Sequence, residues 1–334
     1  MKKPLLYSGK CFLVTGGAGF IGSHLCKRLL EAKASVVCFD NLSSGRMDNI
    51  DDCLVNPSFT FIKGNCNNKV EISKVFKSHK INYVYHYAAT VGVKRTQEKP
   101  ELVLDDINGI KNILELSRKY AVQKFVYASS SEVYGEQITD ELHEDSDPKV
   151  KMPYAVVKIV GETFCKTYWQ QHGLDTTALR FFNVYGPRQD GSGYGFVVSI
   201  FVRQAIEGKD LTVFNGGQMT RSFIYIDDNI EASLRVIDNK QSSGECINVG
   251  SGNFIKIIDL ARKVIDISGN NHLRARLVKS NRDGEIKNRR PSLKKMHKIL
   301  KYRSAYDLDS GLLNTYNHFS KVVPTDSCAS VKAR

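Results

Sequence analysis

The sequence predicts an α/β protein in which a doubly wound parallel sheet carries a smaller C-terminal α+β lobe. Three observations support this fold class. Short apolar segments alternate with amphipathic segments of helical period through the first 180 residues, a rhythm typical of β-α-β units. A glycine-rich turn at residues 15–22, TGGAGFIG, joins the first strand to the first helix. Beyond residue 180, glycine becomes frequent and helices mix with short strands.

The glycine turn is the strongest local signal in the chain. It follows an apolar run at residues 11–14, and apolar residues recur at helical spacing directly after it. A strand, a glycine turn and a helix place the pyrophosphate of a dinucleotide at a helix N-terminus. Gly16 permits the tight turn, Gly19 leaves room for the phosphates, and Gly22 lets the helix pack closely on the strand. The sequence therefore predicts a Rossmann-type dinucleotide site.

An acidic residue indicates which dinucleotide binds. A second apolar strand, at residues 34–39, ends at Asp40. A carboxylate at this place accepts hydrogen bonds from the adenosine ribose hydroxyls and repels a 2′-phosphate. The sequence therefore favours NAD over NADP.

The remaining elements follow in order along the chain. Apolar segments predict strands at residues 59–62, 83–86, 125–128 and 176–180. Helical periodicity predicts helices at residues 70–78, 102–120, 154–172, 197–207 and 257–268. Because β-α-β connections put helices on both faces of a sheet, we expect these strands to be parallel and buried.

We expect three regions along the chain. Residues 1–180 form a Rossmann domain that binds NAD. Residues 181–320 are mainly a substrate-binding lobe over the carboxyl ends of the strands, and residues 223–240 return to the Rossmann part. Residues 321–334 are a flexible tail.

Composition narrows the classes of function. The chain has 334 residues, of which 42% are hydrophobic, and no apolar run approaches the roughly 20 residues that span a bilayer. No long apolar segment begins the chain, so we expect no signal peptide. The eight cysteines form no CxxC pair, which favours free thiols in the cytoplasm over disulfides or a metal site.

The net charge of +13 is the second compositional feature, with 48 Lys and Arg against 35 Asp and Glu. The excess lies near the C-terminus, and no pattern typical of a nucleic-acid-binding domain accompanies it. We interpret it as a solvated basic face that attracts a diphosphate-bearing small substrate, and we expect no nucleic-acid partner.

Two side chains predict acid–base chemistry. Tyr154 and Lys158 stand four positions apart and would share one face of a helix. A tyrosine, with a pKa of about 10, is a poor base. A lysine ammonium about 6 Å away would lower that pKa by about two units, and the cationic nicotinamide of NAD⁺ would lower it further. Ser130, at a strand end, would relay the proton that Tyr154 removes from a sugar hydroxyl.

Taken in their order along the chain, these motifs resemble those of the extended short-chain dehydrogenases/reductases, in particular the NAD-dependent nucleotide-sugar epimerase/dehydratase family. UDP-sugar 4-epimerases and UDP-glucuronate decarboxylases belong to it. The resemblance runs from about residue 9 to residue 318. The matching segments are residues 15–22, 40–45, 86–89, 129–135, 154 with 158, 180–189, 220–228, 248–252 and 309–312.

The resemblance implies roles for individual residues. The catalytic residues would be Ser130, Ser131, Glu132, Tyr154 and Lys158. The residues that hold NAD would be Gly16, Gly19, Phe20, Ile21, Gly22, Asp40, Asn41, Ser44, Gly45, Asn65, Cys66, Tyr87, Ala88 and Ala89, with Tyr154 and Lys158. The residues that bind the nucleotide sugar would be Asn183, Arg188, Val198, Arg221 and Arg282, among which the guanidinium groups suit phosphate oxygens.

At several positions the chain departs from the family pattern. Asn65 stands where an aspartate is usual, so an amide would make the adenine contact. Asp106 replaces a usual asparagine beside the catalytic serine; we interpret it as a packing residue, the alternative being a second charge at the site. Ser222 replaces a usual aspartate near the substrate.

The family passes through a transient 4-keto sugar, after which its reactions diverge. We predict C4 epimerisation of a UDP-linked hexose or hexuronate, because residues 183–190 resemble the epimerase version and Ser131 is not the acid of a 4,6-dehydratase. The alternative is a UDP-glucuronate decarboxylase or NDP-sugar dehydratase, because such enzymes carry a glutamate where Glu132 stands. Glu132 could instead be a structural acceptor. A non-catalytic NAD-binding sensor is a distant alternative.

The resemblance also implies a homodimer that forms through the helices at residues 102–120 and 154–172. The same apolar stripes could equally face the sheet. They consist of Leu104, Ile107, Ile113, Leu116, Val157, Val160, Phe164 and Tyr168.

Overall fold

The computed structural model describes residues 6–91, 96, 98, 100–135, 141–150, 152–190, 196–279 and 288–322. Within this part of the chain, no helix is both long and apolar enough to cross a membrane.

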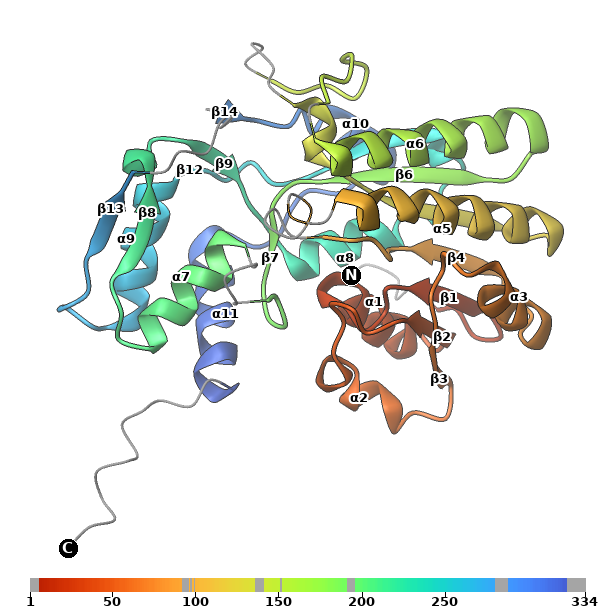
Figure 1. Cartoon of the computed structure of the whole chain (residues 1–334), viewed down its shortest axis with the longest axis horizontal. Coiled ribbons are helices and arrows are strands. Elements are labelled where there is room, and N and C mark those ends of the chain that lie inside the picture. The colour runs from red at the N-terminus through yellow and green to blue at the C-terminus, as the bar shows by residue number, and fades with distance from the viewer. Residues whose placement is uncertain are drawn as a thin grey trace, which may run out of the picture.

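A seven-stranded sheet in which every strand is parallel to its neighbours forms the larger part of the molecule (Figure 1). The strand order is β11-β6-β5-β4-β1-β2-β3. This arrangement confirms the predicted doubly wound parallel sheet, and the chain reverses direction across the sheet between β1 and β4. The strands are β1 (Cys11–Thr15), β2 (Ser35–Asp40), β3 (Phe59–Lys63), β4 (Tyr83–His86), β5 (Lys124–Ser130), β6 (Thr176–Phe181) and β11 (Glu245–Val249).

Helices cover both faces of the sheet. On one face α1 (Phe20–Glu31) packs against α8 (Ile226–Leu234), and α2 (Asp51–Leu54) lies beside α1. On the other face α5 (Pro100–Lys119) lies between α3 (Lys69–Ser78) and α6 (Pro153–His172).

Alternate residues of β1 show how the two faces are filled. Phe12 and Val14 belong to one hydrophobic core, and Leu13 belongs to the core on the opposite face. Successive side chains of a strand point to opposite faces, so a strand buried on both faces is apolar throughout. Burial on both faces therefore explains the continuous apolar run from which this strand was predicted.

The smaller lobe lies at the left of Figure 1. Its helix α7 (Val197–Ile206) packs on α9 (Ile257–Ser268) and α11 (Leu308–Val322). Its strands β8 (Leu211–Phe214) and β13 (Ala275–Val278) are parallel. The remaining elements are β7 (Val184–Tyr185), β9 (Thr220–Ser222), β10 (Ile224–Tyr225), β12 (Phe254–Lys256), β14 (Asn288–Arg289), α10 (Lys294–Leu300), and the 3-10 helices η1 (Met47–Asn49), η2 (Ser131–Tyr134), η3 (Asn215–Gly217) and η4 (Lys240–Ser242).

The chain returns to the main sheet after β10. The sequence assigns residues 223–240 to this return, and α8 lies within them. The structure adds β11, which pairs with β6 at the edge of the sheet. The division of the chain into two domains stays a prediction.

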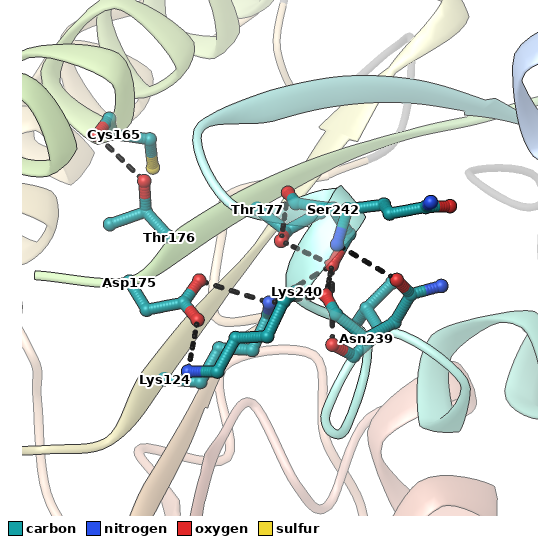
Figure 2. Close-up of polar contacts among 10 residues, drawn as sticks. Lys124, Cys165, Asp175, Thr176, Thr177, Asn239, Lys240 and Ser242 are labelled. Carbon is teal, nitrogen blue, oxygen red and sulfur yellow. Dashed lines mark hydrogen bonds and ion pairs between the residues drawn. The ribbon is translucent and has the colours of Figure 1, made fainter. Parts of the chain in front are cut away.

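A buried ion pair joins the amino ends of the neighbouring strands β5 and β6 (Figure 2). Lys124, which begins β5, is 1% exposed. Its Nζ lies 2.9 Å from Oδ1 of Asp175, just before β6, and donates to Oγ of Ser242 at 2.9 Å. Thr177 of β6 donates to the carbonyl oxygen of Ser242 at 2.7 Å. These bonds join η4 to the starts of both strands, at the end of the sheet opposite Ser130.

Candidate active site

The predicted site residues gather where β1, β4, β5 and β6 end. The glycine turn follows β1, Ala88 lies just beyond β4, and Ser130 ends β5. The carboxyl ends of parallel strands meet at one edge of a sheet, and ligands of open α/β sheets bind there.

The glycine turn has space only for glycine. Gly16 has a φ of +69°, and a Cβ there would lie 2.7 Å from the backbone nitrogen of Ala88. A Cβ on Gly22 would lie 2.1 Å from the carbonyl oxygen of Gly16. Gly19 is the N-cap of α1 and has no side chain to cover the first-turn N–H groups, which include those of Phe20 and Ile21. This bare, positively polarised helix end fits the pyrophosphate of a dinucleotide.

Asp40 lies at the end of β2, beneath the glycine turn. Its carboxylate accepts hydrogen bonds from the backbone N–H groups of Ala18 (3.0 Å) and Leu42 (2.8 Å). Burial raises the pKa of this carboxyl, and the two bonds oppose that effect. A Cβ on Gly45 would approach Oδ1 of Asp40 to 2.8 Å. Asn41 and Ser44 are exposed beside it. The binding of the adenosine half of NAD by this group stays a prediction.

Asn65 and Cys66 differ in residue type from the usual family pattern, and the structure shows what their side chains contact. The Oδ1 atom of Asn65 accepts the backbone N–H of Asn67 at 3.0 Å, so the side chain closes a turn. Cys66 is buried in the core beside Thr15, and burial raises the pKa of its thiol to about 12. Their contacts with adenine stay a prediction.

The segment after β4 faces the glycine turn. Ala88 donates its backbone N–H to Oγ1 of Thr15 at 3.3 Å, and that oxygen also bonds Nδ1 of His86 at 2.7 Å. Tyr87 donates its hydroxyl to Oγ of Ser233 at 2.9 Å. Burial lowers the pKa of His86 to about 3, so the imidazole is neutral at physiological pH. Ala88 is held beside Gly16, and the contacts of Ala88 and Ala89 with the nicotinamide half stay a prediction.

The structure brings Ser130, Tyr154 and Lys158 together. Nζ of Lys158 lies 5.4 Å from the centroid of the Tyr154 ring and donates to the carbonyl oxygen of Ala128 at 2.7 Å. Lys158 is 4% exposed. The phenol of Tyr154 is hydrogen-bonded to Ser130. A proton can therefore pass between a substrate hydroxyl, Ser130 and Tyr154.

The pKa of Tyr154 is raised in the structure, whereas the sequence analysis expected it to be lowered. Burial raises the pKa of the phenol, the bond with Ser130 opposes this, and the carboxylates of Glu132 and Asp106 raise it further. Burial also lowers the pKa of Lys158 to about 8. Desolvation disfavours the charged form of each group and is the largest cause of both shifts. A further positive charge is needed to make Tyr154 a base near neutral pH.

Ser131 and Glu132 occupy the first turn after β5. Ser131 is 3% exposed, and Glu132 is half-buried. The backbone N–H of Glu132 donates to Oγ of Ser130 at 3.2 Å. Because the Glu132 carboxylate acts on the pKa of Tyr154, a second acid–base group lies near this tyrosine.

Behind these residues lies a polar network that sequence reasoning missed. Arg180 of β6 donates to both carboxylate oxygens of Glu162, from Nε at 2.9 Å and from Nη2 at 2.8 Å. The hydroxyl of Ser129 also donates to Glu162. Glu162 stands four residues after Lys158 and therefore shares the helix face that carries Tyr154 and Lys158. This spacing is the signal from which the sequence could have predicted a role for Glu162.

The predicted substrate residues are only partly brought together. Asn183 has a φ of +37°, and its Nδ2 donates to the carbonyl oxygen of Ser222 at 2.7 Å. Arg221 is half-buried in β9, and its Nη1 donates to the carbonyl oxygen of Thr220 at 2.9 Å. Strained backbone at Asn183 is typical of functional sites.

Two other predicted substrate residues, Arg188 and Val198, lie elsewhere, and a third, Arg282, is not among the described residues. Arg188 directs its guanidinium to Asp52 of α2, with 2.9 Å between Nη2 and Oδ2. Val198 is 1% exposed and belongs to the hydrophobic core. Substrate binding by these three stays a prediction.

Comparison with known proteins agrees with this site. Residues 12–250 match the sequence pattern of the NAD dependent epimerase/dehydratase family. A UDP-N-acetyl-alpha-D-glucosaminuronate decarboxylase of Bacillus cytotoxicus is 34% identical over 321 residues, which cover 93% of this chain and 98% of the relative. A putative UDP-glucose 4-epimerase of Methanocaldococcus jannaschii is 34% identical over 312 residues, which cover 91% and 97%.

A solved structure gives the same fold. The UDP-glucuronic acid 4-epimerase of Bacillus cereus, in complex with UDP-glucuronic acid and NAD, superposes with a TM-score of 0.86 at 33% identity. The superposition covers 94% of this chain and 100% of the other.

Proposed function

This chain belongs to the NAD dependent epimerase/dehydratase family, and from this premise we propose that it epimerises C4 of a UDP-linked hexose or hexuronate. The protein is an NAD-dependent enzyme that modifies a nucleotide sugar. The observation that carries the proposal is the contact of Ser130, Tyr154 and Lys158 beside the Ala88 segment. This group can deprotonate a hydroxyl, which a protein that only binds a nucleotide does not need.

In the proposed reaction, Tyr154 removes the proton from the C4 hydroxyl of the sugar. Ser130, hydrogen-bonded to Tyr154, bridges the phenol and the substrate oxygen. Lys158 stabilises the phenolate. NAD, held by the glycine turn and Asp40, would supply the acceptor of the hydride from C4 and its return to the opposite face of the turned 4-keto sugar, and its oxidised nicotinamide would supply a positive charge. After the 4-keto sugar turns over in the site, Tyr154 returns the proton to the oxygen at C4, and C4 is inverted.

The residues also divide the work of binding. Gly16, Gly19 and Gly22 would hold the pyrophosphate of NAD, and Asp40 would hold the adenosine ribose. The guanidinium of Arg221 and the amide of Asn183 would hold the nucleotide diphosphate of the substrate. The support for this division is the bare N-terminus of α1 on one side and the strained Asn183 backbone on the other.

Glu132 favours a second candidate, decarboxylation of a UDP-hexuronate or dehydration of a nucleotide hexose. Its carboxylate is close enough to Tyr154 to raise the pKa of the phenol. A base there would act on C5 or beside C6 once C4 is oxidised. The decarboxylase of Bacillus cytotoxicus is as similar to this chain as the putative epimerase.

One experiment separates the candidates. The protein is incubated with NAD and, in turn, UDP-glucose, UDP-N-acetylglucosamine and UDP-glucuronate, and the products are followed by chromatography and mass spectrometry. A new isomer of unchanged mass supports C4 epimerisation. A loss of carbon dioxide or of water supports the second candidate instead. Tyr154→Phe is the control that must abolish either product.

We also propose a cytoplasmic homodimer. The cysteines of the described residues are free thiols, which supports the cytoplasm. The side chains of Ile113, Leu116 and Val157 are buried within this chain, whereas Leu104 and Phe164 are 50% and 42% exposed. The exposed part of the two-helix face supports a contact between copies.

A further inference from the structure

Asp106 connects α5 to the segment that follows β4. Oδ2 of Asp106 accepts the backbone N–H of Thr90 at 2.6 Å, and Oδ1 accepts the Thr90 hydroxyl at 3.4 Å. Thr90 directly follows Ala88 and Ala89, which lie against the glycine turn. The carboxylate therefore holds, from the side of α5, the segment that closes the catalytic end of β4.

The charge of Asp106 acts on Lys158, which is carried by α6, the helix that packs against α5. Coulombic attraction couples the two groups, so that the ammonium opposes the rise in the pKa of Asp106 that burial causes. In turn Asp106, and after it Glu162, oppose the fall in the pKa of Lys158. The Glu162 carboxylate is held by both donors of Arg180, whereas the hydrogen bonds to Asp106 come from the neutral side chains and backbone of Thr90 and Asn67.

The other titratable groups around Lys158 do not replace Asp106. From β4 the His86 ring is neutral, because its pKa is lowered to about 3. From β5 the Tyr127 ring lies 5.0 Å from Nζ, and burial raises the pKa of its phenol, which stays neutral. From η2 the Glu132 carboxylate acts on Tyr154.

We propose that Asp106 is a positioning residue that keeps the buried Lys158 ammonium charged and anchors the Ala88–Thr90 segment, rather than the packing residue that the sequence suggested. A lysine as buried as Lys158 tends to lose its proton, and a neutral lysine cannot stabilise a phenolate. This inference rests on the proposed function, because it takes Tyr154 as the catalytic base.

The test compares two neutral substitutions on neighbouring residues of α5. Asp106→Asn removes the charge and keeps an oxygen that can accept the Thr90 N–H. Asp105→Asn makes the same change at the preceding, exposed residue and serves as the matched control. Both are measured as kcat/KM against pH on the nucleotide sugar that the wild-type enzyme converts.

The direction of the expected shift follows from the charge. The Asp106 carboxylate raises the pKa values of Tyr154 and Lys158, so its loss lowers both. The acid and alkaline limbs of the Asp106→Asn profile should then move to lower pH by about one unit. The Asp105→Asn profile should superpose on that of the wild type. A change in rate with no displacement along the pH axis would overturn the inference and restore the packing role.

A second measurement does not depend on turnover. The titration of the Lys158 Nζ is followed by NMR in full-length protein labelled at lysine, with Lys158→Met used for assignment. The midpoint should fall in Asp106→Asn and stay in place in Asp105→Asn. Equal midpoints in all three proteins would disprove the coupling. If the wild type converts no UDP-sugar, the proposed function fails, while this titration still decides the role of Asp106.

A reciprocal variant covers the case in which Asp106→Asn does not fold. Coupling between two titrating groups is mutual. Removal of the ammonium in Lys158→Met should therefore raise the midpoint of the Asp106 carboxyl, followed by carbon-13 NMR. An unchanged midpoint would exclude the proposed coupling.

Discussion

Glu162 of α6 and Arg180 of β6 form a two-point ion pair, with 2.9 Å and 2.8 Å between donors and carboxylate oxygens. The side chains are 10% and 5% exposed. Ser129, which precedes Ser130, donates to the same carboxylate. The pair therefore ties the helix that carries Tyr154 and Lys158 to the ends of β5 and β6, and the geometry of the proposed proton relay would depend on it.

The first prediction concerns this pair. Glu162→Gln leaves the Arg180 charge buried without its counter-charge, so the free energy of unfolding should fall by about 3 kcal/mol or more. Unfolding in urea measures the loss. Asp259→Asn is the control, because it breaks an exposed pair with Arg262 and should cost less than about 1 kcal/mol. Equal losses in the two variants would contradict the structural role assigned to Glu162.

The second prediction concerns the phenol. Tyr154→Phe keeps the ring and removes the group that moves the proton, so kcat should fall by about 100-fold or more. Its unfolding curve should match that of the wild type. Product formation from the active UDP-sugar measures the effect, and a rate within a few-fold of wild type would rule out Tyr154 as the base.

The third prediction concerns the stability of the protein at alkaline pH. Burial lowers the pKa of Lys158 from 10.5 to about 8, so between these values the unfolded chain binds more protons than the native protein. The contribution of this lysine to the free energy of unfolding therefore rises with pH across that window. Below it the lysine is charged in both states, and its burial is destabilising.

Urea unfolding of the wild type and of Lys158→Met, from near neutral pH to about pH 10, measures this contribution. The wild type should gain stability relative to the variant as the pH rises. A constant difference between the two proteins across the window would show that Lys158 titrates in the native state as it does in water.

The fourth prediction concerns the glycine turn. Gly22→Ala places a Cβ 2.1 Å from the carbonyl oxygen of Gly16, so the turn must shift and NAD affinity should fall at least about tenfold. Gly252→Ala is the matched control, because no atom lies within 4 Å of a Cβ at that position. Calorimetric titration with NAD measures both variants. Unchanged affinity in Gly22→Ala would show that this turn does not hold the pyrophosphate.

The fifth prediction concerns the proposed dimer. Glutamate in place of Leu104 and Phe164 puts charge on the exposed face of α5 and α6, so sedimentation should show a monomer where the wild type shows a dimer. Leu313→Glu is the control, because Leu313 of α11 is 47% exposed on a different helix. A wild-type protein that sediments as a monomer would refute the proposal.

Local patterns in the sequence were sufficient for much of the fold and part of the site. The alternation of apolar strands and amphipathic helices predicts the parallel sheet, since each β-α-β unit carries its own signal. The glycine turn and the spacing of Tyr154 and Lys158 are also local, so the structure places them as the sequence predicts. The family resemblance marks the same residues and adds a nucleotide sugar as the expected substrate.

Contacts between distant segments were decided only by the tertiary structure. Packing sets β11 beside β6 and Glu162 against Arg180, and it sets α5, which carries Asp106, against α6, which carries Lys158. It also sends Arg188 to Asp52, where a substrate contact was expected. No periodicity or spacing encodes these pairs, because they join residues far apart in the chain. Burial is likewise a property of the packed molecule, and it reverses the direction of the pKa shift at Tyr154 that spacing alone suggested.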